Sequence, residues 1–256
     1  MRSFRSKTLA ALALAAGLLP AAALGHDYLL KPDDATVAAG QPLTVRVMIT
    51  EVYMKGDVIA PADKTTVTLR AGGTAVTVPM QPDEQAKVLR GSVPAPSAGT
   101  ILALADRSGY RSKTPEGNKP VPKTAPGASE TVRSESFAKA LINLSPGDDG
   151  FATVVGTRLE IVPTSNPATP GSNGTTGFRV LFDGKPLATT VTATFDGYSD
   201  KEDDFAVTTE SGPDGVARIR TDRPGFWMVR AQHRFDETTD MHDRYAAGAT
   251  LVFTVR

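Results

Sequence analysis

Short runs of alternating apolar and polar residues, or of β-branched residues, recur along most of the chain, with turn residues between them. A period of two indicates strands with one buried face, because successive side chains of a strand point to opposite sides. Such runs occupy residues 43–49, 65–69, 75–78, 87–93, 100–105, 158–162, 177–182, 191–195, 205–209, 216–219, 226–232 and 249–255. Runs this short and evenly spaced predict an all-β chain with two β-sandwich domains.

Two neighbouring stretches depart from this pattern. Residues 107–131 are rich in Pro, Gly, Lys and Thr, which predicts a long exposed loop. Residues 134–144 have apolar side chains at spacings of three and four, which predicts one short amphipathic helix between the strand sets. These apolar positions are Phe137, Ala140, Leu141 and Leu144.

Turn motifs in the second half define its expected architecture. A turn at 182–187 precedes an apolar run, Pro213-Asp214-Gly215 forms a second turn, and Pro224-Gly225-Phe226-Trp227 opens the next strand. This order is typical of transthyretin-like and immunoglobulin-like sandwiches, and it specifies architecture rather than function. We therefore expect an N-terminal sandwich domain over 26–150 and a transthyretin-like or immunoglobulin-like domain over 151–256.

Residues 1–25 have the three parts of a secretory signal peptide. Arg2, Arg5 and Lys7 precede the Ala/Leu-rich segment 8–19, and Pro20 separates it from a small-residue region. The apolar segment is too short for a membrane anchor, and we expect no membrane span after cleavage. The sequence thus predicts a periplasmic or secreted protein, cleaved before His26 or before Leu24.

Composition narrows the chemistry of the exported chain. It contains no cysteine, which excludes thiolate metal sites and a cysteine nucleophile. Acidic and basic residues are balanced overall, and signal removal leaves a slight acidic excess without a basic patch. We therefore expect no nucleic-acid partner.

His26 would stand at or beside the new N-terminus. Cleavage before His26 would let its free α-amine and its ring nitrogen chelate Cu(II), Ni(II) or Zn(II). Cleavage before Leu24 would place histidine third, and the amine, two amides and the imidazole would then form a square-planar set suited to Cu(II) or Ni(II). The alternative is that His26 is simply the residue that follows the signal.

The chain has two other histidines, both near the C-terminus. His233 follows the apolar strand that contains Trp227, and a partly buried histidine bonded to a backbone carbonyl is its alternative interpretation. His242 lies in the acidic, polar segment Asp240-Met241-His242-Asp243, and a solvated surface residue is the alternative there.

The start Gly25-His26-Asp27-Tyr28-Leu29-Leu30-Lys31-Pro32 and the segment Pro224 to His233 resemble a periplasmic family of domains of unknown function. That family is related to nickel and cobalt uptake, and some members accompany energy-coupling-factor metal transporters. The resemblance covers nearly the whole mature chain. It implies a two-domain β protein that captures and transfers a divalent transition metal.

On the same resemblance, the metal is nickel or cobalt, with copper also possible, and the partner is an inner-membrane metal transporter. The implied ligands are His26, His233 and His242. Asp27, Asp240 and Asp243 could add oxygen ligands or orient a histidine ring. The implied role is binding rather than catalysis.

Two other functions remain open at this stage. An N-terminal histidine with a second histidine on a β-sandwich resembles the histidine brace of copper oxygenases, although the sequence shows no obvious aromatic cluster for a polysaccharide. A metal-free adhesion or carbohydrate-binding sandwich is the other alternative. The acidic segment 200–204 lacks the ligand spacing of an EF-hand, and we expect it to be a solvated loop.

Overall fold

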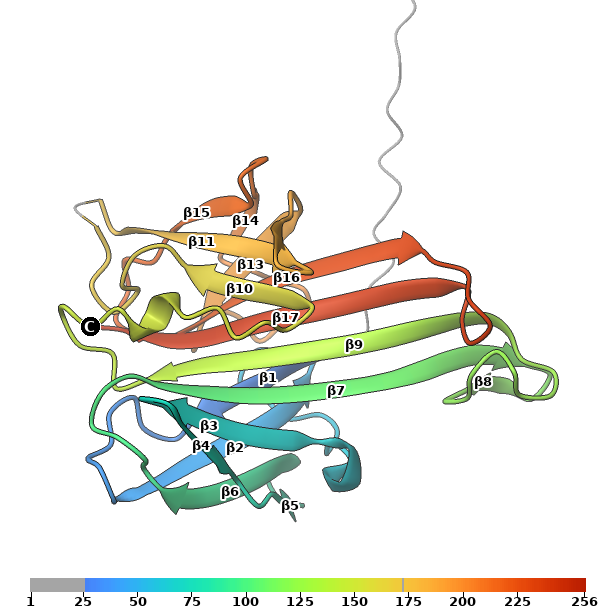
Figure 1. Cartoon of the computed structure of the whole chain (residues 1–256), viewed down its shortest axis with the longest axis horizontal. Coiled ribbons are helices and arrows are strands. Elements are labelled where there is room, and N and C mark those ends of the chain that lie inside the picture. The colour runs from blue at the N-terminus through green and yellow to red at the C-terminus, as the bar shows by residue number, and fades with distance from the viewer. Residues whose placement is uncertain (1–25, 172) are drawn as a thin grey trace, which may run out of the picture.

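A computed structural model describes residues 26–171 and 173–256 of the chain, and three β-sheets form almost all of its regular structure (Figure 1). One sheet joins both halves of the chain. Its strands, in spatial order, are β14 (Val207–Glu210), β13 (Thr190–Phe195), β16 (Gly225–Asp236), β17 (Arg244–Val255), β9 (Ser129–Ile142), β7 (Ile101–Thr114), β3 (Thr66–Ala71) and β4 (Thr74–Thr77), and β8 (Gly117–Lys119) pairs with β7.

A smaller sheet lies against each face of this central sheet (Figure 1). The first contains β1 (Asp27–Pro32), β2 (Pro42–Thr50), β6 (Val88–Pro94) and β5 (Gln81–Asp83). The second contains β10 (Leu159–Pro163), β11 (Thr175–Phe182), β12 (Lys185–Pro186) and β15 (Val216–Arg220). Two single-turn 3₁₀ helices, η1 (Ala62–Lys64) and η2 (Gly150–Ala152), lie outside the sheets.

Each sandwich has its own apolar core. The first core contains Leu29, Leu89 and Ile142, and the second contains Phe178, Trp227 and Phe253. Both cores use the central sheet, so they lie back to back on its two faces. The all-β sandwich prediction is confirmed, whereas the domain boundary near residue 150 stays a prediction.

The helix predicted over 134–144 is wrong, because these residues belong mostly to β9. Ala138, Ala140 and Ile142 face the first core, whereas Leu141 faces the second. A strand buried on both faces carries apolar residues at consecutive positions, which hides its period of two. The spacing of Phe137, Ala140, Leu141 and Leu144 therefore matches a helix only by coincidence.

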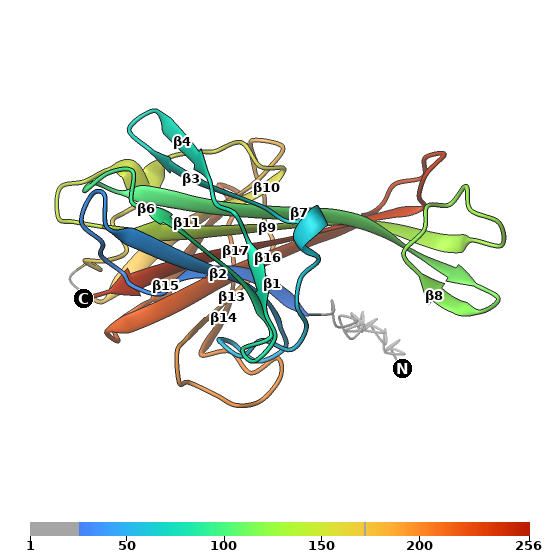
Figure 2. The same cartoon turned by 90° about the horizontal axis from the view of Figure 1, so that it is seen from below.

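The predicted loop over 107–131 is also wrong in large part. β7 continues to Thr114, β8 follows, and β9 begins at Ser129. The outer parts of β7 and β9, together with β8, lie beside the outer parts of β16 and β17. All of them extend beyond both sandwiches (Figure 2). Neither face is covered there by an outer sheet, so polar residues can form strands without an apolar pattern.

The predicted signal peptide, residues 1–25, lies outside the described residues. In the part of the chain that the structure describes, no helix has the length and apolar character needed to cross a membrane.

Candidate functional site

The residue that follows the predicted signal peptide lies beside an acidic residue of the neighbouring strand. β1 begins at Asp27 and runs antiparallel to β2, where Asp27 pairs with Thr50. Glu51 follows Thr50 directly, so it lies opposite His26. The His26 Nε2 atom is 3.4 Å from Glu51 Oε1, and the His26 side chain is 36% exposed.

A loop from the second half of the chain reaches the same place. Lys55 Nζ lies 2.5 Å from Asp200 Oδ1, which ties the loop after β13 to the loop after β2. In that loop, the neighbouring Glu51 carboxyl raises the pKa of Glu202, by hydrogen bonding to its protonated form and by like-charge repulsion. The acidic segment 200–204 is thus exposed, as predicted, and it also places a second carboxyl group next to Glu51.

Asp27 is held by an arginine of the central sheet. Its carboxylate accepts two hydrogen bonds from Arg230 Nη1, at 2.9 and 3.2 Å, and both side chains are largely buried. Burial raises the pKa of Asp27 above its ordinary value, although the Arg230 guanidinium acts in the opposite direction. Asp27 therefore fixes the start of β1 on the central sheet.

His233 lies on the other face of that sheet. Arg230 and His233 are three positions apart on β16, so their side chains point to opposite faces. The His233 ring packs against Phe182 and Phe235, with ring centroids 4.7 and 5.1 Å away. Burial and the nearby Arg158 guanidinium lower the pKa of His233. The central sheet therefore separates His233 from the Asp27 end of β1.

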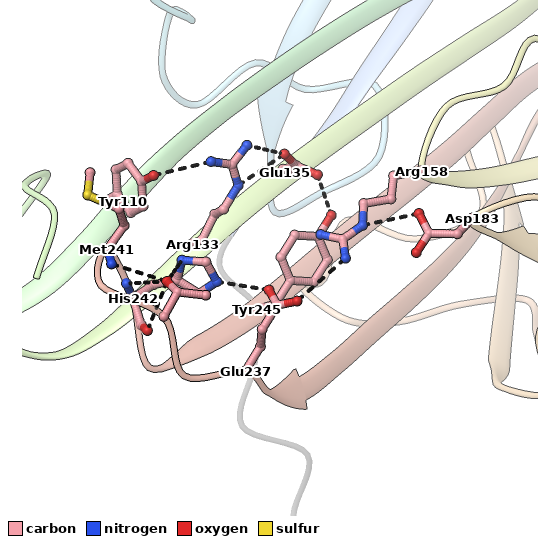
Figure 3. Close-up of polar contacts among 10 residues, drawn as sticks. Tyr110, Arg133, Glu135, Arg158, Asp183, Glu237, Met241, His242 and Tyr245 are labelled. Carbon is pink, nitrogen blue, oxygen red and sulfur yellow. Dashed lines mark hydrogen bonds and ion pairs between the residues drawn. The ribbon is translucent and has the colours of Figure 1, made fainter.

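His242 is nearly buried in the loop between β16 and β17, and both of its ring nitrogens have partners (Figure 3). Nδ1 lies 3.0 Å from Thr239 Oγ1, and Nε2 lies 2.8 Å from Glu237 Oε2. A metal ion would have to displace one of these contacts. His242 thus has the bonding of a structural histidine that fixes its loop.

The two aspartates that flank His242 differ in their contacts. Asp243 pairs with Lys123 Nζ at 2.5 Å and accepts a 2.9 Å hydrogen bond from the Thr131 amide. These contacts lower its pKa. Asp240 is exposed at the surface of the same loop.

A polar network joins His242, through Glu237, to Arg158 (Figure 3). Arg158 lies 4.0 Å from the Tyr245 ring centroid, and one of its nitrogens is 3.7 Å from Glu237 Oε1. The Tyr245 hydroxyl donates to Glu135, which also accepts from Arg133. The Arg158 cation near His233 opposes the binding of a second cation at that histidine.

The predicted set of His26, His233 and His242 therefore does not converge. Among the described residues, no group of three or more His, Asp or Glu side chains is placed to hold a metal ion. The structure instead places Glu51 beside His26 and Glu202 beside Glu51, two pairings that sequence reasoning missed. No sequence signal identifies these partners, because they depend on strand register and on a loop contact more than 140 residues apart in the chain.

Comparison with known proteins places the chain in a family. Residues 23–235 match the family described as "Domain of unknown function (DUF4198)". The chain belongs to this family. The match supports the predicted resemblance to a family of domains of unknown function. The relation of the DUF4198 chain to nickel and cobalt uptake stays a proposal. Comparison with curated protein sequences gives no match.

Solved structures give only weak likenesses to the DUF4198 chain. The D0-D1 domain of intimin is 14% identical with a TM-score of 0.21, over 88% of this chain and 97% of that one. The ectodomain of mouse nectin-like molecule 4 is 11% identical with a TM-score of 0.21, over 90% and 64%. The group B streptococcus pilus 2b backbone protein is 10% identical with a TM-score of 0.17, over 88% and 98%. Scores this low carry no inference about function.

Proposed function

We propose that the mature DUF4198 chain binds a divalent transition metal at its processed N-terminus, outside the cytoplasmic membrane. The observation that carries this proposal is the position of Glu51 at Nε2 of His26. Histidine ligands commonly donate their other ring N–H to a carboxylate, which fixes the ring and makes it a better ligand. Glu51 would hold Nε2 in this way and leave Nδ1 for the metal.

Nδ1 is also the ring nitrogen that can close a chelate with the chain's own α-amine. After cleavage before His26 the amine and Nδ1 belong to the same residue, and after cleavage before Leu24 two backbone amides join them. Such nitrogen donors suit Ni(II), Co(II), Cu(II) and Zn(II). We favour nickel or cobalt because the family resemblance implies them.

The surroundings of His26 suit capture and release. The side chain is partly exposed, and the carboxylates of Glu51 and Glu202 create a negative local field that attracts cations. An open site of this kind exchanges metal more readily than a closed structural site. The proposed role is therefore delivery of metal to an inner-membrane transporter rather than catalysis.

The copper-oxygenase alternative receives less support. A histidine brace needs a second histidine close to the N-terminal one, and His233 lies across the central sheet from the start of β1. His26 is therefore the one histidine that we propose as a metal ligand.

Calorimetric titration of the exported, tag-free protein near pH 7.5 tests the proposal. We expect binding of one equivalent of Ni(II) or Co(II), and Glu51→Gln should weaken it about tenfold because the ring loses its carboxylate partner. Glu237→Gln, which removes the carboxylate at His242, is the matched control and should leave the affinity unchanged. Absence of binding to Ni(II), Co(II), Cu(II) and Zn(II) alike would refute the proposal.

The pH dependence of binding gives a separate prediction. A free α-amine has an ordinary pKa of about 7.7–8.0 and must lose a proton to bind metal. Proton competition at the amine should therefore weaken the affinity roughly tenfold from pH 7.5 to 6.5, and roughly tenfold again by pH 5.5. Titrations at these three pH values measure the effect. A nearly constant affinity would instead indicate a site made of carboxylates.

A further inference from the structure

A groove of about 470 Å³ opens on the second sandwich, between the loop after β13 and the turn before β16. None of its lining residues is proposed to bind metal, although Tyr198 lies on the same loop as Asp200 and Glu202. The side chains that matter for its chemistry are Phe195, Tyr198, Trp227, Arg220, Asp222 and Arg223. Volumes of this size are typical of pockets for small organic ligands.

Three aromatic rings form one wall of the groove. Phe195 lies between Trp227 and Tyr198, with ring centroids 4.9 and 5.3 Å away. Trp227 is buried, and its indole N–H donates a 2.8 Å hydrogen bond to the Arg223 carbonyl. Tyr198 is 41% exposed and is one of few large apolar side chains with that exposure in the described residues. Its ring therefore offers an apolar surface supported from behind by Phe195.

Three charged side chains also line the groove. Arg220 Nε lies 2.6 Å from Asp222 Oδ2, and the Arg223 guanidinium stacks 5.3 Å from the Phe195 ring centroid. Guanidinium groups present planar forks of donors that match a carboxylate, and Asp222 adds acceptor oxygens. Because Arg220 is paired with Asp222, Arg223 is the lining residue whose positive charge no lining carboxylate offsets.

We propose that the groove binds an acidic oligosaccharide that contains hexuronate units. The C–H face of a pyranose ring would stack on Tyr198, and its carboxylate would meet the guanidinium groups of Arg220 and Arg223. Asp222 would accept hydrogen bonds from ring hydroxyls.

The tryptophan supplies a direct reporter. Trp227 is the single tryptophan of the chain and contacts Phe195 at the groove. Titration of tri-galacturonate into the mature protein, with EDTA present to exclude metal effects, should therefore change its fluorescence. We expect saturable binding, and neutral galactotriose should bind about tenfold more weakly because it lacks the carboxylates.

Substitutions in the groove separate the two interactions. Tyr198→Ala should weaken tri-galacturonate binding about tenfold, whereas Tyr198→Phe keeps the ring and should retain the affinity. Arg223→Gln should remove most of the preference for tri-galacturonate over galactotriose. Arg179→Gln, an exposed arginine on β11, is the matched control and should change nothing.

Three results would overturn the proposal. The first is an absence of any saturable change with tri-galacturonate while thermal unfolding shows folded protein. The second is equal binding of tri-glutamate, which would show that only charge is recognised. The third is a Tyr198→Ala variant with full affinity, which would place the saccharide elsewhere. None of these results bears on the metal proposal, because EDTA is present throughout.

Discussion

Replacement of Glu160 by leucine, with Lys139 kept, is expected to lower the free energy of unfolding by about 3–5 kcal/mol. The side chains of Glu160 on β10 and Lys139 on β9 form an ion pair and are 2% and 6% exposed. Glu160 also accepts hydrogen bonds from the backbone amides of Val155 and Gly156, both at 2.9 Å. The substitution would leave a buried ammonium ion and two amide donors without their acceptor.

The double variant Lys139→Met/Glu160→Leu is the control for this prediction. It removes both charges together, so it should recover a large part of the lost stability. Urea unfolding followed by circular dichroism measures all three proteins. A Glu160→Leu protein within about 1 kcal/mol of the wild type would show that the pair is not desolvated in solution.

The same ion pair predicts how the stability of the Glu160→Leu variant depends on pH. Burial lowers the pKa of Lys139 below its ordinary value, and Glu160 opposes that shift. Loss of Glu160 should therefore lower this pKa further. Between the folded and unfolded pKa values the unfolded chain binds the extra proton, so stability rises with pH across that window. The destabilisation by Glu160→Leu should accordingly shrink as the pH rises toward 10.

A short extension ahead of the mature N-terminus is expected to weaken metal binding by roughly 100-fold or more, which corresponds to about 2.7 kcal/mol. The extension moves the free amine away from His26 and so removes the chelate ring, whereas the imidazole and Glu51 stay in place. His26→Ala should have an effect of similar size. His233→Ala and His242→Ala should leave the affinity for metal unchanged, because neither residue lies next to His26.

The strands could be predicted where one face is buried and the other is more exposed, as for β3 and β15, because burial then alternates along the chain. β9 could not be predicted, because apolar cores on both of its faces remove the alternation of buried and exposed residues. The parts of β7 and β9 that extend beyond the sandwiches could not be predicted for the opposite reason, because neither of their faces is covered by an outer sheet. Both errors arise from tertiary contacts that local periodicity does not contain.

The candidate site shows a similar division. The place of His26 follows from the signal peptide pattern, and its predicted chemistry needs only its own amine. The place of Glu51 beside it depends on the register of β1 with β2, and the place of Glu202 beside Glu51 depends on the loop tied by Lys55 and Asp200. His233 could be assigned to a sheet face from strand parity, but the sequence does not reveal that Asp27 lies on the other face.

The aromatic groove also escaped sequence reasoning. Tyr198 and Trp227 are 29 positions apart, and they come together because Phe195 pairs with Trp227 across β13 and β16. A cluster of this kind is formed by cross-strand pairing, so a search along the chain does not find it.

The most direct test of the central claim compares two proteins in one calorimetric titration with Ni(II) near pH 7.5. One is the mature chain with its N-terminus verified by sequencing, and the other is the same chain with the short extension. The proposed site requires one equivalent of tight binding to the mature chain and a loss of roughly 100-fold or more in the extended chain. Equal affinity in both proteins would show that the free amine of the processed terminus is not a ligand.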